Sequence, residues 1–264
     1  MAVKDRASRG MGQLREHAKI TLRTVLYKRN LDLVRGPYAV RVASALTWLG
    51  IDTVLDVGAN IGQYGSALRA SGFDGRVVSC EPLSQAFAQL SRRAKSDPRW
   101  TTLQTAVGDC SGVLEINVSA NSYSSSILPM ADAHLGAAPG SHFIGTEKVP
   151  VTTVADLVLD QRVTPARALL KVDTQGYEGP VLDGAGTLLA DFAAVQLELS
   201  LVPLYDGQLL FPALVERLSR AGFAMYCLDA GFGDPRTGRM LQCDGLFVRK
   251  DLLPGPPGSH DSRP

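Results

Sequence analysis

The stretch Thr53–Gly62, with the sequence TVLDVGANIG, decides the fold. It opens with a β-branched and aliphatic run, which is typical of a strand buried on both faces of a parallel sheet. The chain then turns through a loop in which Gly58 and Gly62 permit positive φ or the close approach of a ligand to the backbone. A helix is expected over 63–70, so its N-terminal N–H groups would face whatever lies above the loop.

A carboxylate closes the next apolar run. Residues 76–80 predict a second strand, and Glu81 and Pro82 follow it directly. In doubly wound folds, an acidic residue at this position holds a ribose through its hydroxyls. The loop has neither the three-glycine pyrophosphate fingerprint nor a phosphate-binding P-loop. The residues alone therefore predict a nucleoside ligand, with an ordinary strand–turn–helix of an α/β protein as the alternative.

Composition favours one large α/β domain. The chain has 264 residues, of which 45% are hydrophobic, and its formal net charge is +1. The balanced charge argues against a nucleic-acid partner. Four cysteines without a C-x-x-C pair suit a reduced compartment, and no apolar run is long enough for a signal peptide or a membrane span. We therefore expect a cytoplasmic protein.

The N-terminal segment 1–35 carries an excess of positive charge, with nine Lys and Arg against three Asp and Glu. A basic amphipathic helix can lie on an anionic membrane surface, so peripheral contact with the inner membrane face is one interpretation. The other is a helix that packs on its own domain. The expected organisation is a helical lead-in and cap (1–50), a cofactor-binding domain (51–250) and a disordered tail (251–264).

Apolar periodicity predicts the remaining elements. Strands are expected at 101–107, 112–120, within 153–159, and at 168–173, 193–199, 223–228 and 246–249, and helices at 38–49, 84–95, 179–189 and 211–221. Their alternation predicts a doubly wound, mostly parallel sheet with an antiparallel C-terminal strand. The alternating run 112–120 predicts an antiparallel strand added at the sheet edge. Between the strands, 121–145 is an irregular segment that could close over a second ligand.

Three motifs together resemble one family. They are Asp56-Val-Gly-Ala-Asn-x-Gly62, Glu81-Pro82, and Lys171-Val-Asp-Thr-Gln-Gly-Tyr-Glu178 with Val181-Leu182-x-Gly184-Ala185. They resemble the FkbM family of S-adenosylmethionine-dependent methyltransferases over about 54–198. Segments 231–238 and 242–245 resemble a subgroup associated with sugar O-methylation in actinobacterial glycolipid pathways. Gln175 departs from the Glu of many family members, so a role that depends on that carboxylate is absent.

The resemblance implies a class I methyltransferase fold with S-adenosylmethionine as cofactor. The loop 56–62 would hold the methionine and ribose portions, and Glu81 would accept hydrogen bonds from both ribose hydroxyls. Gly108 and Asp109 would lie near the adenine, and Asp173 near the methionine amine or the transferred methyl. The implied cofactor-binding set is Asp56, Gly58, Asn60, Gly62, Glu81, Pro82, Gly108, Asp109 and Asp173.

Methyl transfer to a hydroxyl needs alignment of the acceptor and a general base. Candidate catalytic residues are Asp173, Glu178, Glu198 and His142, with His134 on the same irregular segment as His142. Glu178 could instead cap the following helix, Glu198 could pair with an Arg or Lys, and the histidines could be inert. Ser124–Ser126 predicts either loop filler or a hydroxyl-rich wall. We expect no metal, because no ligand spacing demands one.

The resemblance implies a sugar hydroxyl of a glycan or glycolipid as acceptor, for example that of a deoxysugar such as rhamnose. The alternative is a nucleoside-cofactor-binding Rossmann protein of dehydrogenase-like or non-catalytic scaffold type. The sequence leaves the oligomeric state open, with a homodimer among the alternatives.

Overall fold

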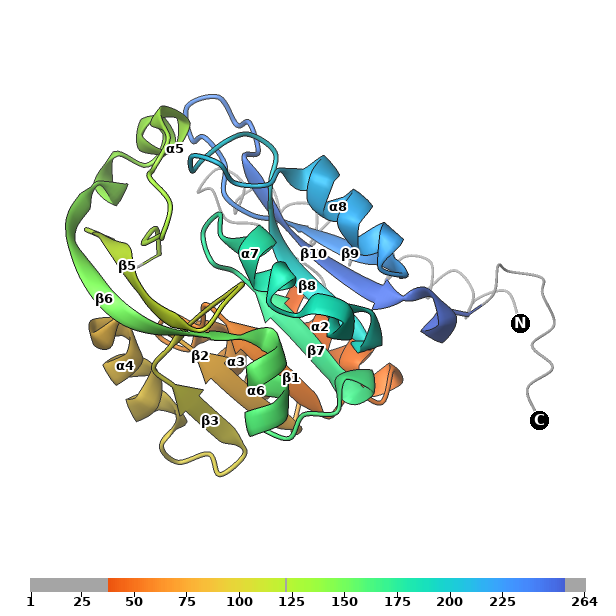
Figure 1. Cartoon of the computed structure of the whole chain (residues 1–264). Coiled ribbons are helices and arrows are strands. Elements are labelled where there is room, and N and C mark those ends of the chain that lie inside the picture. Colours follow the sequence, from red (N-terminus) through yellow and green to blue (C-terminus); the bar gives the residue numbers. More distant parts are fainter. Residues whose placement is uncertain (1–37, 122, 255–264) are drawn as a thin grey trace, which may run out of the picture. The chain divides into compact units, whose positions relative to one another are not determined.

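The computed structural model describes residues 38–121 and 123–254, shown in colour in Figure 1. The basic segment 1–35, with its predicted helix, lies outside the described residues. No helix in the described part of the chain is long and apolar enough to cross a membrane.

A seven-stranded sheet forms the centre of the domain, with the strand order β3-β2-β1-β7-β8-β10-β9. Its strands are β1 (Thr53–Val57), β2 (Arg76–Cys80), β3 (Trp100–Leu103), β7 (Ala168–Val172), β8 (Ala194–Ser200), β9 (Phe223–Ala230) and β10 (Gln242–Arg249). The first five in this order are parallel, whereas β10 pairs antiparallel with both β8 and β9. The predicted fold class is therefore confirmed, including the antiparallel C-terminal part.

The position of β1 explains why the opening stretch decides the fold. All five of its residues are buried, as expected for a central strand covered on both faces. β1 pairs with β2 on one side and with β7 on the other, so the chain order reverses between β1 and β7. Open α/β sheets bind ligands outside the carboxyl ends of their strands at such a switch point.

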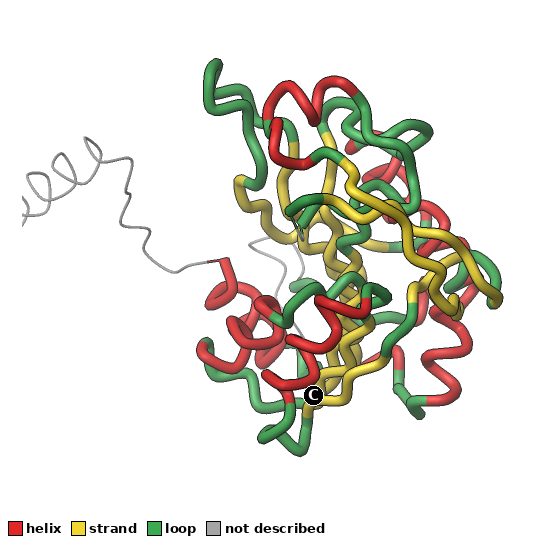
Figure 2. The backbone as a smooth tube through the Cα atoms, turned by 90° about the vertical axis from the view of Figure 1, so that its left-hand side faces the viewer, coloured by secondary structure: helices red, strands yellow, loops and turns green. Residues whose placement is uncertain are grey.

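Helices cover both faces of the sheet (Figure 2). One face is covered by α2 (Tyr38–Trp48), α3 (Gln63–Ala70) and α4 (Ser84–Ala94), and the other by α6 (Val154–Asp160), α7 (Glu178–Asp183) and α8 (Phe211–Arg220). The buried side chains Leu46, Leu68 and Leu90 belong to the first layer, and Leu157 and Leu214 to the second. The two apolar layers hold the strand ends in place.

A second, three-stranded sheet lies beside the first, with the order β4-β6-β5. Its strands are β4 (Ala106–Gly108), β5 (Gly112–Ser119) and β6 (Phe143–Thr153). The predicted single strand 101–107 is wrong, because β3 and β4 belong to different sheets. The chain breaks at Thr105, whose hydroxyl donates to the carbonyl of Pro150, on β6, at 3.2 Å.

The prediction for 112–120 is correct in type but wrong in place. The strand forms as β5, but it pairs antiparallel with β6 instead of extending the main sheet. Ile116 on β5 packs with Val149 on β6 and with Leu83 and Ala86, which start the α4 region. Alternation indicates that one face is buried, but it does not identify the partner strand.

Short helices replace parts of the predicted loops and tail. The segment predicted as irregular contains α5 (Asp132–Ala137), η1 (Pro139–Ser141) and the start of β6. The predicted helix 179–189 is split into α7 and η3 (Gly186–Asp191), and η2 (Pro165–Arg167) precedes β7. The tail predicted from residue 251 is wrong at its start, because η4 (Lys250–Leu252) forms there and Leu252 and Leu253 pack on the core.

Candidate active site

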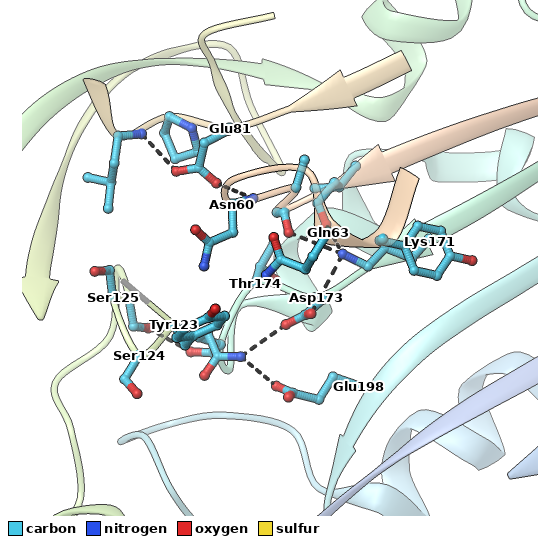
Figure 3. A pocket seen from close by; sticks show the side chains of 18 of the residues that line it. Asn60, Gln63, Glu81, Tyr123, Ser124, Ser125, Lys171, Asp173, Thr174 and Glu198 are labelled. Atoms are coloured by element: carbon cyan, nitrogen blue, oxygen red, sulfur yellow. Dashed lines mark hydrogen bonds and ion pairs between the residues drawn. The ribbon is translucent and has the colours of Figure 1, made fainter. Parts of the chain in front are cut away.

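A cavity of about 650 Å³ opens at the carboxyl ends of the parallel strands (Figure 3). The ends of β1, β2, β7 and β8 supply one side, and the start of the antiparallel β10 reaches the same edge. The segment between β5 and β6 supplies the opposite wall. The volume lies within the range of about 300–1,000 Å³ that is usual for small-molecule sites.

The loop after β1 is held in one shape by positive φ angles. Gly58, Asn60 and Gly62 have φ of 75°, 47° and 85°. Gly58 admits no side chain, because a Cβ there would lie 1.8 Å from the carbonyl oxygen of Asp173. The close contact brings the loops after β1 and β7 together. Gly58 and Asn60 line the cavity, whereas Gly62 begins α3 and packs against Leu90.

Glu81 lies at the end of β2 and faces the cavity. Its Oε2 accepts a hydrogen bond from the backbone N–H of Asn60 at 2.8 Å, and Oε1 accepts one from Leu83 at 3.0 Å. Burial raises the pKa of Glu81 to about 7, although both backbone hydrogen bonds act to lower it. A carboxylate has about four acceptor positions, so Glu81 keeps capacity for two more donors. Pro82 lines the cavity beside it.

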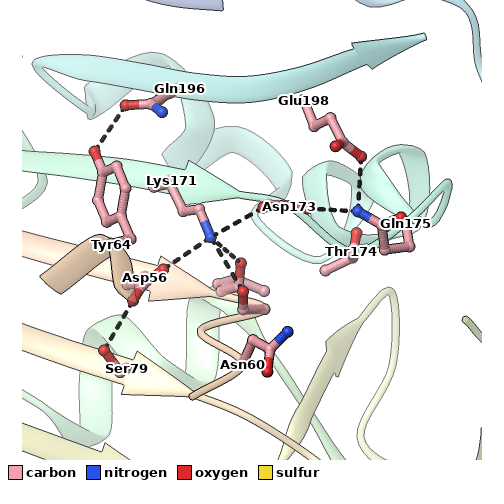
Figure 4. Close-up of polar contacts among 12 residues, drawn as sticks. Asp56, Asn60, Tyr64, Ser79, Lys171, Asp173, Thr174, Gln175, Gln196 and Glu198 are labelled. Carbon is pink, nitrogen blue, oxygen red and sulfur yellow. Dashed lines mark hydrogen bonds and ion pairs between the residues drawn. The ribbon is translucent and has the colours of Figure 1, made fainter. Parts of the chain in front are cut away.

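Asp56 lies under the loop and is fully buried, so its side chain is not part of the cavity lining. Its Oδ1 is 3.0 Å from Lys171 Nζ, and its Oδ2 accepts from Ser79 Oγ at 2.9 Å (Figure 4). Lys171 Nζ also donates to the carbonyl of Gly58 at 3.1 Å and lies 3.6 Å from Asp173 Oδ2. Asp56 therefore supports the loop after β1 through Lys171.

Lys171 is a functional residue that the sequence interpretation missed. Burial lowers its pKa, but the carboxylates of Asp56 and Asp173 act in the opposite direction and the pKa ends above its ordinary value. The buried cation thus stays charged and ties β1 to β7. The sequence carried a signal for it, because a lysine inside an otherwise apolar strand needs buried partners.

Asp173 and Glu198 lie at one end of the cavity and share a single amide group (Figure 4). Gln175 Nε2 donates to Asp173 Oδ1 and to Glu198 Oε2, each at 3.0 Å. The hydroxyl of Tyr205 donates to Gln175 Oε1 at 2.9 Å, which fixes the orientation of the amide. Gln242 Nε2 donates to the same Glu198 oxygen at 2.8 Å. An acidic Glu at position 175 would repel both carboxylates.

Two carboxyl groups at this end, those of Glu198 and Asp244, hold protons more tightly than free ones. Burial, followed by the charge of Asp173, raises the pKa of Glu198 well above its ordinary value. The same two causes raise the pKa of Asp244, at the start of β10, to about 6. Asp173 is more exposed, with 35% of its side chain accessible. Asp173 is thus the carboxylate most open to a ligand.

Besides Asp56 and Gly62, four predicted site residues lie outside the cavity lining. Glu178 is buried, and its Oε1 accepts from the backbone N–H groups of Thr174 and Gly176, so it closes the loop after β7. His142 has an exposed side chain beyond η1. Gly108 lies on β4 in the second sheet, where it packs against Tyr177, and Asp109 follows it directly. Thr105, Ala106 and Val107 line the cavity in their place.

The wall opposite the sheet comes from the segment between β5 and β6. Its lining residues include Asn121, Tyr123, Ser124, Ser125, Ser126 and His134, and Phe232 joins them from the β9–β10 connection. Ser126 Oγ donates to the backbone carbonyl of Gln175 at 2.6 Å, which ties the wall to the loop after β7. The serine run is therefore a hydroxyl-rich wall. His134, not His142, reaches the cavity.

Within the described residues, no group of three or more His, Cys, Asp or Glu side chains is placed to hold a metal ion. Polar lining residues that neither motif nor spacing singled out include Tyr64 and Gln196. Tyr64 donates its hydroxyl proton to Gln196 Oε1 at 2.7 Å. These residues come from distant parts of the chain, so only the fold brings them together.

Comparison with known proteins identifies a family. The Methyltransferase FkbM domain matches residues 56–225. No protein among the curated sequences matches. Similar solved structures include the magnesium protoporphyrin IX methyltransferase of Synechocystis PCC 6803 with bound SAM, at 11% identity, covering 88% of this chain and 96% of that chain with a TM-score of 0.41.

Two further structures have comparable likeness. The 1,6-didemethyltoxoflavin-N1-methyltransferase of Burkholderia thailandensis has 16% identity, covers 95% of this chain and 92% of its own, and has a TM-score of 0.41. An rRNA methylase from Streptococcus thermophilus has 12% identity, with 82% and 98% covered and a TM-score of 0.41. Likeness at this level says nothing about the acceptor. The family match covers more than half of the chain and makes S-adenosylmethionine the cofactor, so the chain belongs to the FkbM family of methyltransferases.

Proposed function

We propose that this methyltransferase is an O-methyltransferase that acts on a sugar hydroxyl of a glycan or glycolipid, such as that of a deoxysugar like rhamnose. The observation that carries the proposal is the pair of carboxylates, Asp173 and Glu198, held side by side by Gln175 at the end of the cofactor cavity. A hydroxyl is a weak nucleophile, so its methylation benefits from a general base in this position.

The cavity residues fit S-adenosylmethionine. The spare acceptor positions of Glu81 suit the two ribose hydroxyls, because its carboxylate is already fixed by two backbone N–H groups. Asp173 suits the cationic methionine end, and the apolar stretch Ala106–Val107 with Leu83 suits the adenine. Asp56, Gly62 and Lys171 would act indirectly, by holding the loop. When bound, the cofactor supplies a methyl group on positively charged sulfur.

We assign the base role to Asp173. As the acceptor oxygen bonds to the methyl carbon and the carbon–sulfur bond breaks, the hydroxyl proton passes to a carboxylate of the chain. Glu198 is less available as a base, because burial and the negative charge of Asp173 raise its pKa and favour its protonated form. Glu198 would instead orient the acceptor, together with Gln242 and Gln175. The remaining contribution of the chain to catalysis is to position the acceptor and the methyl donor.

The decisive experiment is methyl transfer from labelled S-adenosylmethionine to a panel of acceptors. The panel contains rhamnosides, other glycosides, extracted glycolipids, RNA fragments and small amines. We expect label only in glycans, as an ether that mass spectrometry places on a sugar oxygen. Label in RNA or on nitrogen would overturn the proposal. Asp173→Asn serves as the inactive control. The dehydrogenase-like alternative predicts stabilisation by a reduced nicotinamide cofactor, and no observation favours it.

We also propose that segment 1–35 brings a cytoplasmic enzyme to the inner membrane face, where lipid-linked acceptors would be available. The support is its excess of basic residues, nine against three acidic ones. Each basic residue near an anionic surface contributes about 1 kcal/mol. The full chain is expected to sediment with anionic vesicles at low salt and to be released at high salt. A chain that begins at Tyr38 should remain in the supernatant, and equal sedimentation of both would contradict the proposal.

A further inference from the structure

His134 is a buried, chemically active side chain that the methyl-transfer step does not use. It lies on α5, its side chain is only 3% exposed, and it lines the cavity on the wall opposite the sheet. Its ring contacts two aromatic rings, Tyr205 edge-on at 5.2 Å and Phe232 at 5.5 Å between centroids. The two contacts hold the plane of the ring in place.

The hydrogen bonds around His134 decide where its proton lies. Ser124 Oγ donates its only proton to Ser141 Oγ at 3.2 Å, and Asn121 Nδ2 donates to the same oxygen at 2.8 Å. Ser124 Oγ can then only accept from His134 Nε2, which lies 3.2 Å away. A neutral imidazole carries one proton, so Nε2 bears it and Nδ1 presents a lone pair.

Nδ1 has no hydrogen-bond partner among the described residues, although it is buried. Burial also lowers the pKa of His134, so the ring stays neutral at physiological pH and Nδ1 stays an acceptor. Buried polar atoms in proteins are nearly always paired, so an unpaired one on a residue that lines a cavity calls for a partner from outside the chain. That partner must supply a donor at this point.

We propose that His134 Nδ1 accepts a hydrogen bond from a hydroxyl of the acceptor, and that it thereby selects which face of a sugar ring enters the site. The proposal rests on the proposed function. Phe232 offers an apolar face beside it, and the serine wall offers further hydroxyls. An aromatic face with a few fixed polar groups suits a polyhydroxylated ring, which has an apolar face and a hydroxyl rim.

Two matched variants separate this role from a structural one. In His134→Gln the side-chain nitrogen can replace Nε2 and keep the contact with Ser124, but the acceptor at Nδ1 is lost. In His134→Asn the side-chain oxygen takes the place of Nδ1, but the contact with Ser124 is lost. We expect His134→Gln to raise the KM for the acceptor about tenfold, the loss of one hydrogen bond to a neutral group. His134→Asn should keep that KM within about threefold.

The affinity for S-adenosylmethionine should be the same in both variants and the native chain, since His134 lies on the acceptor wall. A similar loss of acceptor affinity in both variants, or in His134→Asn alone, would assign His134 a structural role and overturn the inference. Melting temperatures of both variants check that they fold.

Nitrogen NMR tests the same proposal directly, because it shows which ring nitrogen of His134 carries the proton. The chain has four histidines, and His134→Gln identifies the His134 signals in protein labelled with ¹⁵N-histidine. We expect a proton on Nε2 and none on Nδ1 before any acceptor is added, and a shift of Nδ1 alone on titration with a methylated acceptor and demethylated cofactor. A proton on Nδ1 overturns the inference whatever the acceptor is. Glycan methylation with an unshifted Nδ1 overturns the inference and leaves the proposed function standing, whereas methylation of a non-glycan overturns the proposed function and, with it, the selection of a sugar face.

Discussion

Glu81 is the residue at which pH should control cofactor binding. Its pKa in the free protein is about 7, and ribose hydroxyls donate best to the ionised carboxylate. The ionised fraction rises about tenfold between pH 6 and pH 8, so the affinity for S-adenosylmethionine should rise by roughly the same factor. Calorimetry at both pH values measures it. In Glu81→Gln the affinity should be weaker, and this pH dependence should disappear. A tenfold change that persists in the variant would assign the titration to another group.

Asp173 and Glu198 can be distinguished by changes that keep their shape. Asp173→Asn removes the base that we propose, and it should lower kcat by about 10²–10⁴. Glu198→Gln should lower kcat much less and raise the KM for the acceptor. Glu178→Gln is the control, because an amide oxygen can still accept from Thr174 and Gly176. A large loss of kcat in Glu198→Gln with little in Asp173→Asn would exchange their roles.

At the scale of elements, the loop after β1 depends on glycine at one position more than at others. Gly58→Ala would place a methyl group 1.8 Å from the Asp173 carbonyl oxygen, at a φ of 75°. Gly72→Ala is the matched control, because Gly72 has a φ of 91° but nothing within 4 Å of its Cβ position. The free energy of unfolding of Gly72→Ala should fall by about 1 kcal/mol, which is the cost of a side chain at positive φ alone.

The free energy of unfolding of Gly58→Ala should fall several times more, because the loops after β1 and β7 must separate. It should also lose cofactor binding, whereas Gly72→Ala should retain it. Denaturant unfolding and calorimetry measure the two quantities. Equal free energies of unfolding for the two variants would mean that the contact between the loops contributes nothing to the fold.

Local signals explain which elements could be predicted. The strands β1, β2 and β7 and the helix α3 follow from apolar runs, positive-φ glycines and helical spacing, all within a few residues. The break between β3 and β4 could not be predicted, because β4 pairs with β6, and the partner of Ala106 is Val151, 45 positions later in the chain. The same limit applies to β5, whose alternation was clear but whose partner strand was not.

The residues of the candidate site also divide into those that local sequence signals predict and those that only the fold brings together. The loop glycines and Glu81 were predictable because strand ends in a parallel sheet meet at one edge. Gly108 and Asp109 were misplaced together with the strand that carries them. The choice between His134 and His142 depends on α5 and on the bonds among Asn121, Ser124 and Ser141, which no periodicity indicates.

At the scale of the whole molecule, the buried carboxyls make the cofactor-free protein more stable in mild acid. The pKa of Asp244 rises from 3.8 to about 6, and that of Glu198 is also raised well above its ordinary value. A raised folded pKa contributes stability that is full below the unfolded pKa and is lost as pH rises through the folded value. This contribution to the free energy of unfolding should therefore fall between about pH 4 and pH 6 for Asp244.

Asp244→Asn tests this point. The variant cannot titrate, so its urea midpoint should fall less than that of the native chain between pH 4 and pH 6. A native midpoint that falls no more steeply than that of the variant would remove Asp244 as a source of the pH dependence. S-adenosylmethionine should raise the midpoint of both proteins at pH 7, because a ligand that binds only the folded state stabilises it.

The separate three-stranded sheet has a consequence for how such enzymes diverge. The wall that we propose for the acceptor comes largely from the segment between β5 and β6, whose described residues, 120–121 and 123–142, contribute no strand to the seven-stranded sheet. In the proposed function, loops of that sheet hold the methyl donor. Substitutions and length changes in the segment can therefore accumulate while the donor machinery stays intact. We expect chimaeras that exchange this segment between relatives to inherit their acceptor from the segment and their donor affinity from the host.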